Sequence, residues 1–438
     1  MSSLLSTARL PGLTALLAVS LAACGGPDPV ASQTGNRAPG GAAGSQQSEP
    51  QAADGAPVET APPNVPEFEP AFPGQTRAPA VQTQTPIEAT EVAGGLAYPW
   101  SIAFLPDGRM LVTEKPGRLR IVTAAANGRP SAISEPVLGV PRVDARGQGG
   151  LLDVELGPDY AESGLVYVTY YEPREGGNGL AVARGRLVER GGAARLDGVE
   201  VIFRMMPTLD SDKHAGGRMV WAPDGTLFVT LGERSVLEGR RQARDLGSHF
   251  GKIVRINPDG SVPDDNPFVG RDGARPEIWS LGHRNVLAAT LDAEGRLWEV
   301  EMGPQGGDEL NLVRRGADYG WPTVGYGEEY SGAPIHETTE LAGTEQPVYY
   351  WDPVISPSGM AVYSGRLVPE WRGNVFIGGL SSTNVVRLVL EGDRVVGEER
   401  LLRENGERIR EVVEGPDGAL YLATDAADGR ILRLGPSD

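Results

Sequence analysis

Residues 223–230 read Pro-Asp-Gly-Thr-Leu-Phe-Val-Thr, and this pairing of a tight turn with a short strand is the feature that predicts the fold. Proline and aspartate favour the first positions of a tight turn, and glycine readily adopts the positive φ that many turns require. The β-branched and aromatic residues that follow suit a pleated strand. The stretch is therefore predicted to be one turn and the strand that leaves it.

The same turn and strand recur along the chain, at residues 106–113, 158–170, 292–300, 371–378 and 416–423. The six units have a mean spacing of about 58 residues, which exceeds that of the commoner propeller repeats, so long loops between strands are expected. We predict an all-β fold, a six-bladed β-propeller of four-stranded antiparallel blades. The alternative is a pair of β-sandwiches in which the turns recur by coincidence.

The predicted propeller occupies residues 87–438. A strand-like run at Ile87–Val92 precedes the first complete unit. An open ring would leave strand edges exposed, so we expect this run to join the last blade and close the ring.

The N-terminus has the features of a secretion signal. Arg9 precedes the apolar run Leu13–Leu21, and two alanines then lead to Cys24, the only cysteine of the chain. This pattern predicts a signal peptide over residues 1–23, and the run is too short for a transmembrane helix. A single cysteine also excludes an intramolecular disulfide framework.

The sequence Leu-Ala-Ala-Cys-Gly around Cys24 resembles the bacterial lipobox. The resemblance implies cleavage before Cys24 and acylation of its thiol. Because Gly25 and not aspartate follows, the analogy with Gram-negative sorting indicates the cell envelope, at the periplasmic face of the outer membrane. Residues 24–86 are rich in Ala, Pro, Gly, Gln, Ser and Thr and are expected to form a disordered tether between this membrane anchor and the propeller.

The charge balance argues against one class of partner. The formal net charge is −18 and the pI is about 4.8. Nucleic-acid-binding proteins normally present a basic face, so no nucleic acid partner is expected. The acidity favours solubility and does not identify a substrate.

Histidine is scarce, with four in the chain, and His214 lies in the glycine-containing loop Lys213–Arg218. A neutral imidazole in such a loop can act as a general base near pH 7, or it can simply form local hydrogen bonds. Arg284 and Asn285 place a planar cation beside an amide, a pairing suited to a carboxylate or quinone oxygen.

Two further stretches contain residue types that bind metal ions or ligands. Residues 303–312 combine loop carbonyls with Asp and Glu, the oxygen ligands that Ca²⁺ prefers. Arg408 and Arg410 lie on one face of a predicted strand, which is either a ligand-binding face or a solvated edge. No cysteine and histidine cluster has the spacing of a zinc site.

These motifs together resemble the glucose/sorbosone dehydrogenase family. The resemblance covers residues 90–436 and rests on motifs in the same order: Gly149–Val154, His214 with Gly216–Arg218, Gly282–Asn285, Gly306–Asn311 and Tyr319–Pro322. It implies a six-bladed propeller and oxidation of aldose sugars at the anomeric carbon, with pyrroloquinoline quinone and Ca²⁺ as cofactors. The electron acceptor that reoxidises the quinone is not indicated.

The resemblance also implies roles for individual residues. His214 matches the catalytic base, and Glu233 the carboxylate that orients it. Arg284 matches a group that holds the quinone and stabilises its negative charge as it is reduced. The remaining matches are to quinone contacts at Gln148, Asn285, Arg408 and Arg410, to Ca²⁺-binding backbone carbonyls at Gly303 and Pro304, and to a second, structural Ca²⁺ site at Glu309 and Tyr319.

The chain departs from the family pattern at two places. Val286-Leu287-Ala288 replaces a Pro-Gln-Gly sequence, and Ser381 stands at or beside the position of a cofactor-binding lysine. Two alternatives therefore remain beside the dehydrogenase. One is a Ca²⁺-dependent propeller lactonase, and the other is a non-catalytic binding propeller that has lost the quinone.

Overall fold

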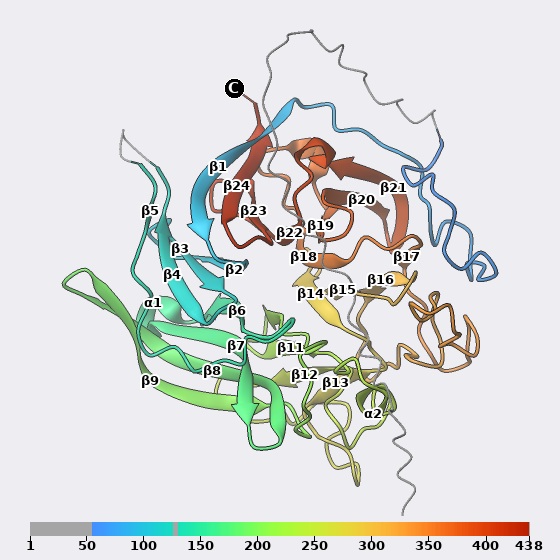
Figure 1. Cartoon of the computed structure of the whole chain (residues 1–438), viewed down its shortest axis with the longest axis horizontal. Helices are drawn as coiled ribbons and strands as arrows, with labels where there is room; N and C mark the ends of the chain where they lie inside the picture. The colour runs from blue at the N-terminus through green and yellow to red at the C-terminus, as the bar shows by residue number, and fades with distance from the viewer. Residues whose placement is uncertain (1–54, 126–129, 438) are drawn as a thin grey trace, which may run out of the picture. The chain divides into compact units, whose positions relative to one another are not determined.

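The computed structural model describes residues 55–125 and 130–437, and in this part of the chain the strands form six four-stranded sheets. Neighbouring strands within each sheet are antiparallel, as in the pairs β3–β4 and β11–β12. The sheets are arranged around a common centre (Figure 1). The predicted six-bladed β-propeller is therefore confirmed, and the sandwich alternative is wrong.

The first three blades are built in chain order from the inner strand outward. Their strands are β2 (Pro99–Phe104), β3 (Met110–Glu114), β4 (Arg118–Thr123) and β5 (Ala132–Ile133); β6 (Leu151–Leu156), β7 (Leu165–Arg174), β8 (Gly177–Arg190) and β9 (Ala193–Arg204); and β10 (Met219–Trp221), β11 (Leu227–Leu231), β12 (Lys252–Ile256) and β13 (Ile278–Leu281).

The other three blades follow the same order, except that the last one takes its outer strand from the N-terminal side. Their strands are β14 (Val286–Leu291), β15 (Leu297–Glu301), β16 (Asp308–Leu312) and β17 (Tyr349–Trp351); β18 (Pro357–Val362), β19 (Val375–Gly379), β20 (Val385–Glu391) and β21 (Arg394–Leu401); and β22 (Ile409–Glu414), β23 (Leu420–Thr424), β24 (Gly429–Pro436) and β1 (Ile87–Leu96).

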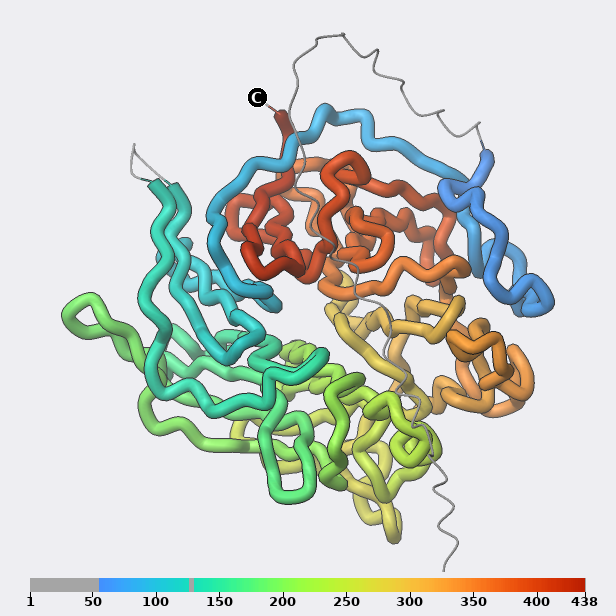
Figure 2. Tube along the Cα trace, in the orientation of Figure 1, coloured from blue at the N-terminus to red at the C-terminus, as the bar shows by residue number. Residues whose placement is uncertain are grey.

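The ring is closed by the pairing of β1 with β24. The register includes Ala89 opposite Leu434, so the two ends of the propeller share one sheet. Figure 2 shows this blue-to-cyan segment beside the red C-terminal one. The closure expected for the run at Ile87–Val92 is confirmed, and it removes the exposed edges that an open ring would have.

The first strand of each blade contacts the first strand of the next, as β14 does β18 and β18 does β22. These inner strands therefore line the centre of the ring. Helix is limited within the described residues to short turns, namely α1 (Tyr160–Ser163), α2 (Leu237–Arg240) and two 3₁₀ turns at Pro369–Trp371 and Arg403–Asn405.

Apolar side chains fill the spaces between neighbouring blades. Leu152 and Val182 of the second blade pack in one cluster with Leu227 and Val254 of the third, and all four are buried. Fully burying such a side chain stabilises the fold by about 1.5–3 kcal/mol. The positions of the inner strands, and of the loops that precede them, are fixed by this packing.

Residues 55–86 are packed against the propeller, so the predicted disordered tether over residues 24–86 extends too far toward the C-terminus. The backbone N–H of Val65 donates to Asp352 at 3.0 Å, that of Ala78 to the Tyr349 hydroxyl at 2.8 Å, and that of Thr83 to Glu399 at 2.7 Å. The segment has few large apolar residues, and polar groups of the propeller hold its backbone beside the buried Val65 and Ala78. We refer to residues 55–86 as the N-terminal strap.

The predicted signal peptide, Cys24 and the tether up to residue 54 lie outside the described residues. In the part that the structure describes, no helix combines the length and apolar character needed to cross a membrane.

Candidate active site

A cavity of about 380 Å³ lies where the chain enters the inner strands of the blades. Each blade contributes at least one residue from this end of its first strand or from the loop before it: Trp100, Gln148, Gly216, Asn285, Ser356 and Arg410. Because inner strands meet at the centre, residues far apart in sequence converge here. We call this space the central cavity.

His214 lies on a sharply bent loop beside the central cavity. The residue itself has φ 47°, and Gly216 follows with φ 72°. A Cβ atom at Gly216 would lie 2.6 Å from the carbonyl oxygen of Thr230, so only glycine fits there. Ala215 and Gly216 line the cavity, and the buried His214 lies directly before them.

Glu233 orients the imidazole of His214. The two side chains approach to 2.7 Å between Nδ1 and Oε1, and Glu233 is fully buried. The backbone N–H of His214 donates to the side-chain oxygen of Gln148 at 2.9 Å. Three of the residues predicted for the site are therefore brought together.

The imidazole of His214 is held in its neutral form. Burial lowers its pKa, the nearby Arg284 guanidinium lowers it further, and Glu233 opposes both, so that the pKa falls to about 4. A histidine that is neutral at pH 7 can accept a proton through its second ring nitrogen, Nε2.

Asn285 lines the central cavity and has an unused donor. Its Oδ1 accepts the backbone N–H of Gly216 at 3.3 Å, while its buried Nδ2 has no hydrogen-bond partner among the described residues. A buried donor without a partner is costly, so this amide is suited to a ligand in the cavity.

Arg284 lines a second, smaller cavity, not the central one. Its Nη1 atom donates to the carbonyl oxygen of Met302 at 2.7 Å, and its guanidinium carbon lies 5.3 Å from the ring centroid of Trp321. Met302 lines both cavities, so they are neighbours.

Arg408 and Arg410 both line the central cavity, as predicted, and share Asp425 as an ion-pair partner at 2.9 and 3.1 Å. Ser381 is exposed and lies outside the cavity lining. The lining also includes Lys115. This residue was not predicted from the sequence, because its position beside the cavity depends on how two blades pack together.

The four predicted calcium ligands lie together. Gly303, Pro304, Glu309 and Tyr319 all line the second cavity with Arg284. The hydroxyl of Tyr319 already donates to the Leu312 carbonyl oxygen at 2.7 Å, so its backbone carbonyl is the oxygen that it can offer to a cation.

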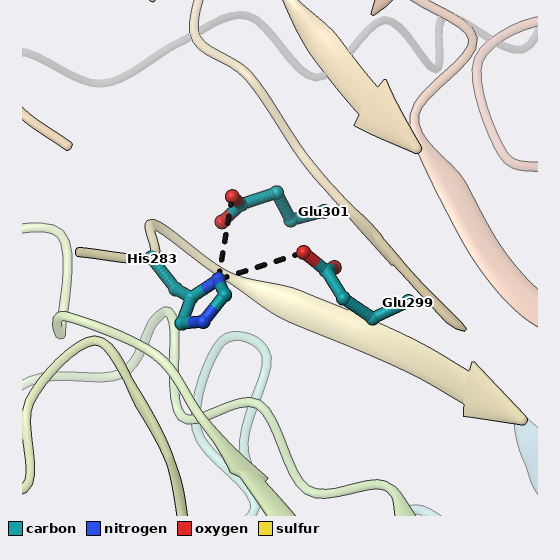
Figure 3. Close-up of side chains that lie close together, drawn as sticks. All are labelled: His283, Glu299 and Glu301. Carbon is teal, nitrogen blue, oxygen red and sulfur yellow. Dashed lines mark ion pairs between the residues drawn. The ribbon is translucent and has the colours of Figure 1, made fainter. Parts of the chain in front are cut away.

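A buried group of titratable residues adjoins this cavity (Figure 3). The Nδ1 atom of His283 lies 3.5 Å from Glu299 and 3.6 Å from Glu301. Burial lowers the pKa of His283, but the two carboxylates outweigh it and raise the pKa to about 9. Asn311 donates to both Glu299 and Glu309, at 2.9 and 3.2 Å, and so connects the group to the predicted calcium ligand Glu309.

Comparison with known proteins identifies the family and supports the fold. The sequence profile of the family described as glucose / sorbosone dehydrogenase matches residues 96–433. Aldose sugar dehydrogenase YliI of Escherichia coli (strain K12) is 43% identical over 346 residues, which are 78% of this chain and 91% of that protein.

Solved structures of related proteins have the same fold. A crystal structure of a glucose dehydrogenase has a TM-score of 0.76 and 47% identity, covering 80% of this chain and all of that one. The PQQ-bound form of an aldose sugar dehydrogenase from Streptomyces coelicolor has a TM-score of 0.65 and 29% identity, over 81% of this chain and 99% of that one. The chain belongs to the glucose/sorbosone dehydrogenase family, whose members among these relatives are sugar dehydrogenases.

Proposed function

We propose that the protein oxidises aldose sugars at the anomeric carbon to lactones, with pyrroloquinoline quinone as the electron acceptor in the site. The observation that best supports this is the pair of His214 and Glu233, a neutral imidazole with a fixed orientation beside the central cavity. A relative solved in a PQQ-bound form supports the choice of quinone.

The residues of the central cavity fit an anionic, oxygen-rich cofactor. Pyrroloquinoline quinone has three carboxylates, and Arg408 and Arg410 offer planar cations that suit them. Gln148 lines the cavity, and Asn285 adds the buried amide donor that has no partner within the described residues. The backbone carbonyls of Gly303 and Pro304, which line the adjoining second cavity, would hold the Ca²⁺ that accompanies the quinone.

His214 would act as the general base. With Glu233 as the acceptor at Nδ1, the ring proton stays on that nitrogen and the lone pair is left on Nε2. The bound quinone supplies a two-electron acceptor for the hydride of the anomeric carbon. His214 takes the proton of the anomeric hydroxyl, and the carbonyl of the lactone forms as that proton leaves.

Arg284 would act through its charge. Its guanidinium is close enough to His214 to lower the pKa of the imidazole, and it donates to the carbonyl oxygen of Met302, the residue at the boundary of the two cavities. Positive charge at this boundary stabilises negative charge that develops on a reduced acceptor. Burial and this charge together lower the pKa of His214 and so keep its imidazole unprotonated before the reaction.

A second Ca²⁺ is proposed at Glu309 and Tyr319, where it would be structural. Burial raises the pKa of Glu309, and the neighbouring Glu301 raises it further. A divalent cation would favour the ionised form of these carboxylates and offset their mutual repulsion.

The proposed reaction is tested with the full chain reconstituted with pyrroloquinoline quinone and Ca²⁺. We expect an aldose to reduce an artificial dye acceptor, and its methyl glycoside, which lacks the anomeric hydroxyl, to be inactive. Replacement of the anomeric hydrogen by deuterium should slow single-turnover oxidation. Equal rates with the aldose and the glycoside would contradict oxidation at the anomeric carbon.

We also propose that the protein is attached to the cell envelope by acylation of Cys24, at the periplasmic face of the outer membrane. The support is the sequence before Cys24, which lies outside the described residues. Cys24→Ser should abolish lipid labelling and release the protein from the membrane fraction. Unchanged labelling and fractionation of this variant would contradict the anchor.

A further inference from the structure

Lys115 lies in the turn between β3 and β4 of the first blade, and its backbone is fixed from two sides. Its N–H donates to the Tyr98 carbonyl oxygen at 3.1 Å, and its own carbonyl accepts the N–H of Leu151 at 3.1 Å. Tyr98 precedes the first blade and Leu151 begins the second. The root of the Lys115 side chain is therefore held at the junction of two blades.

The side chain of Lys115 lines the central cavity. Its Nζ donates to the carbonyl oxygen of Gly147, next to Gln148, and lies 5.6 Å from the ring centroid of Tyr98. Both partners are uncharged. Burial lowers the pKa of Lys115, whereas Asp425 and Asp212 act only through space to raise it.

The charges that line the central cavity, within the described residues, are the cations of Lys115, Arg408 and Arg410 and the carboxylate of Asp425. Both arginines are ion-paired to Asp425, so that carboxylate offsets part of their charge. Lys115 is bound by a neutral carbonyl instead. Its ammonium group thus retains its capacity to pair with an anion that enters the cavity.

We propose that Lys115 is a further cofactor-binding residue, whose ammonium group pairs with a carboxylate of the anionic quinone in the central cavity. The inference rests on the proposed function, because it requires a quinone with carboxylates in this cavity. The lysine stem has four flexible carbons, so Nζ can leave the Gly147 carbonyl and follow the carboxylate while the backbone stays in place.

The test is a binding titration of the full apo chain with pyrroloquinoline quinone and Ca²⁺, followed by quenching of tryptophan fluorescence. Lys115→Gln removes the charge but keeps a donor for Gly147, and it should weaken binding by about ten- to a hundredfold. Lys115→Arg should restore most of the affinity. Arg394→Gln, at an exposed cation of the outer strand β21 that does not line the cavity, is the matched control and should leave it unchanged.

A second ligand separates charge pairing from a general loss of structure. The trimethyl ester of the quinone has no carboxylate charge, so Lys115→Gln and the unmodified chain should bind it equally. Equal binding of the acid form by both proteins would overturn this inference and leave the proposed function intact. Absence of any quinone binding by the unmodified chain would overturn the proposed function as well as the role of Lys115.

Discussion

His214 owes its chemistry to neighbours that change its pKa in opposite directions. Burial and the positive charge of Arg284 lower the pKa, while Glu233 raises it, and the result is a pKa of about 4. Glu233 also contacts Nδ1 of the ring, which leaves Nε2 as the nitrogen that can accept a proton. Removing the imidazole should therefore affect proton transfer far more than ligand binding.

The first prediction is that His214→Ala lowers turnover of the reconstituted enzyme by about 10²–10⁴-fold, because the anomeric hydroxyl loses its general base. Quinone binding, measured by fluorescence quenching, should change little in the same variant. Near-normal turnover in a folded His214→Ala protein would exclude this residue as the base.

The pH dependence of the reaction gives a second prediction. The base must be unprotonated, and its pKa is lowered to about 4, so activity should be retained as the pH falls through 6.5, the value of an unperturbed histidine. The acid limb of kcat/KM should lie near pH 4. An acid limb at pH 6.5 or above would contradict the effect of burial and of Arg284.

The sequence predicted many, but not all, residues of the site. His214, Gln148, Asn285 and the two arginines of the cavity belong to recognisable motifs, and they meet because their motifs precede inner strands. Lys115 and Asp425 were not predicted. Each enters the cavity from the turn between the second and third strands of its blade, not from the segment before the inner strand. Such proximity depends on register and blade packing, which single motifs do not specify.

At the scale of elements, the turn-and-strand repeat was sufficient to predict six blades, because period-two strands and glycine turns are local properties of the sequence. The N-terminal strap was not predicted as ordered. Its composition has few large apolar residues, and it is held largely by hydrogen bonds to groups such as Asp352 and Glu399, which lie about 300 residues away.

The strap leads to a third prediction. Asp352 is buried and accepts the backbone and side-chain N–H groups of Asn64 and the N–H of Val65, at 2.7 to 3.0 Å. Asp352→Ala should lower the free energy of unfolding or of local opening by about 1–3 kcal/mol. Hydrogen exchange should accelerate selectively in residues 55–86.

The control for this prediction is Asp264→Ala at an exposed turn position. This variant should exchange like the unmodified protein across the strap. Unchanged exchange in residues 55–86 of Asp352→Ala would show that the strap does not depend on these bonds.

At the scale of the whole molecule, the ring is closed by hydrogen bonds between β1 and β24, and the site lies where all six blades converge. Closure restrains the inner strands and hence the spacing between His214, Asn285 and the cavity cations. Ligands that bind only the folded ring stabilise it by mass action.

The fourth prediction follows from the proposed calcium sites. Removal of bound Ca²⁺ with a chelator should lower the melting temperature, because Glu309 and the carbonyl ligands are brought together only in the folded chain. Added Ca²⁺ should restore the melting temperature, whereas Mg²⁺, which prefers a smaller octahedral site, should restore less. An unshifted transition after verified metal removal would contradict a structural calcium.

The central claim is that the cavity of this propeller binds pyrroloquinoline quinone and uses it to oxidise a sugar. The most direct measurement is an absorbance titration of the full apo chain with the quinone in the presence of Ca²⁺, followed by addition of an aldose. The account predicts saturable binding of one quinone per chain and its reduction by the sugar. No detectable binding by a chain shown to be folded by circular dichroism would contradict it and would favour a non-catalytic binding propeller.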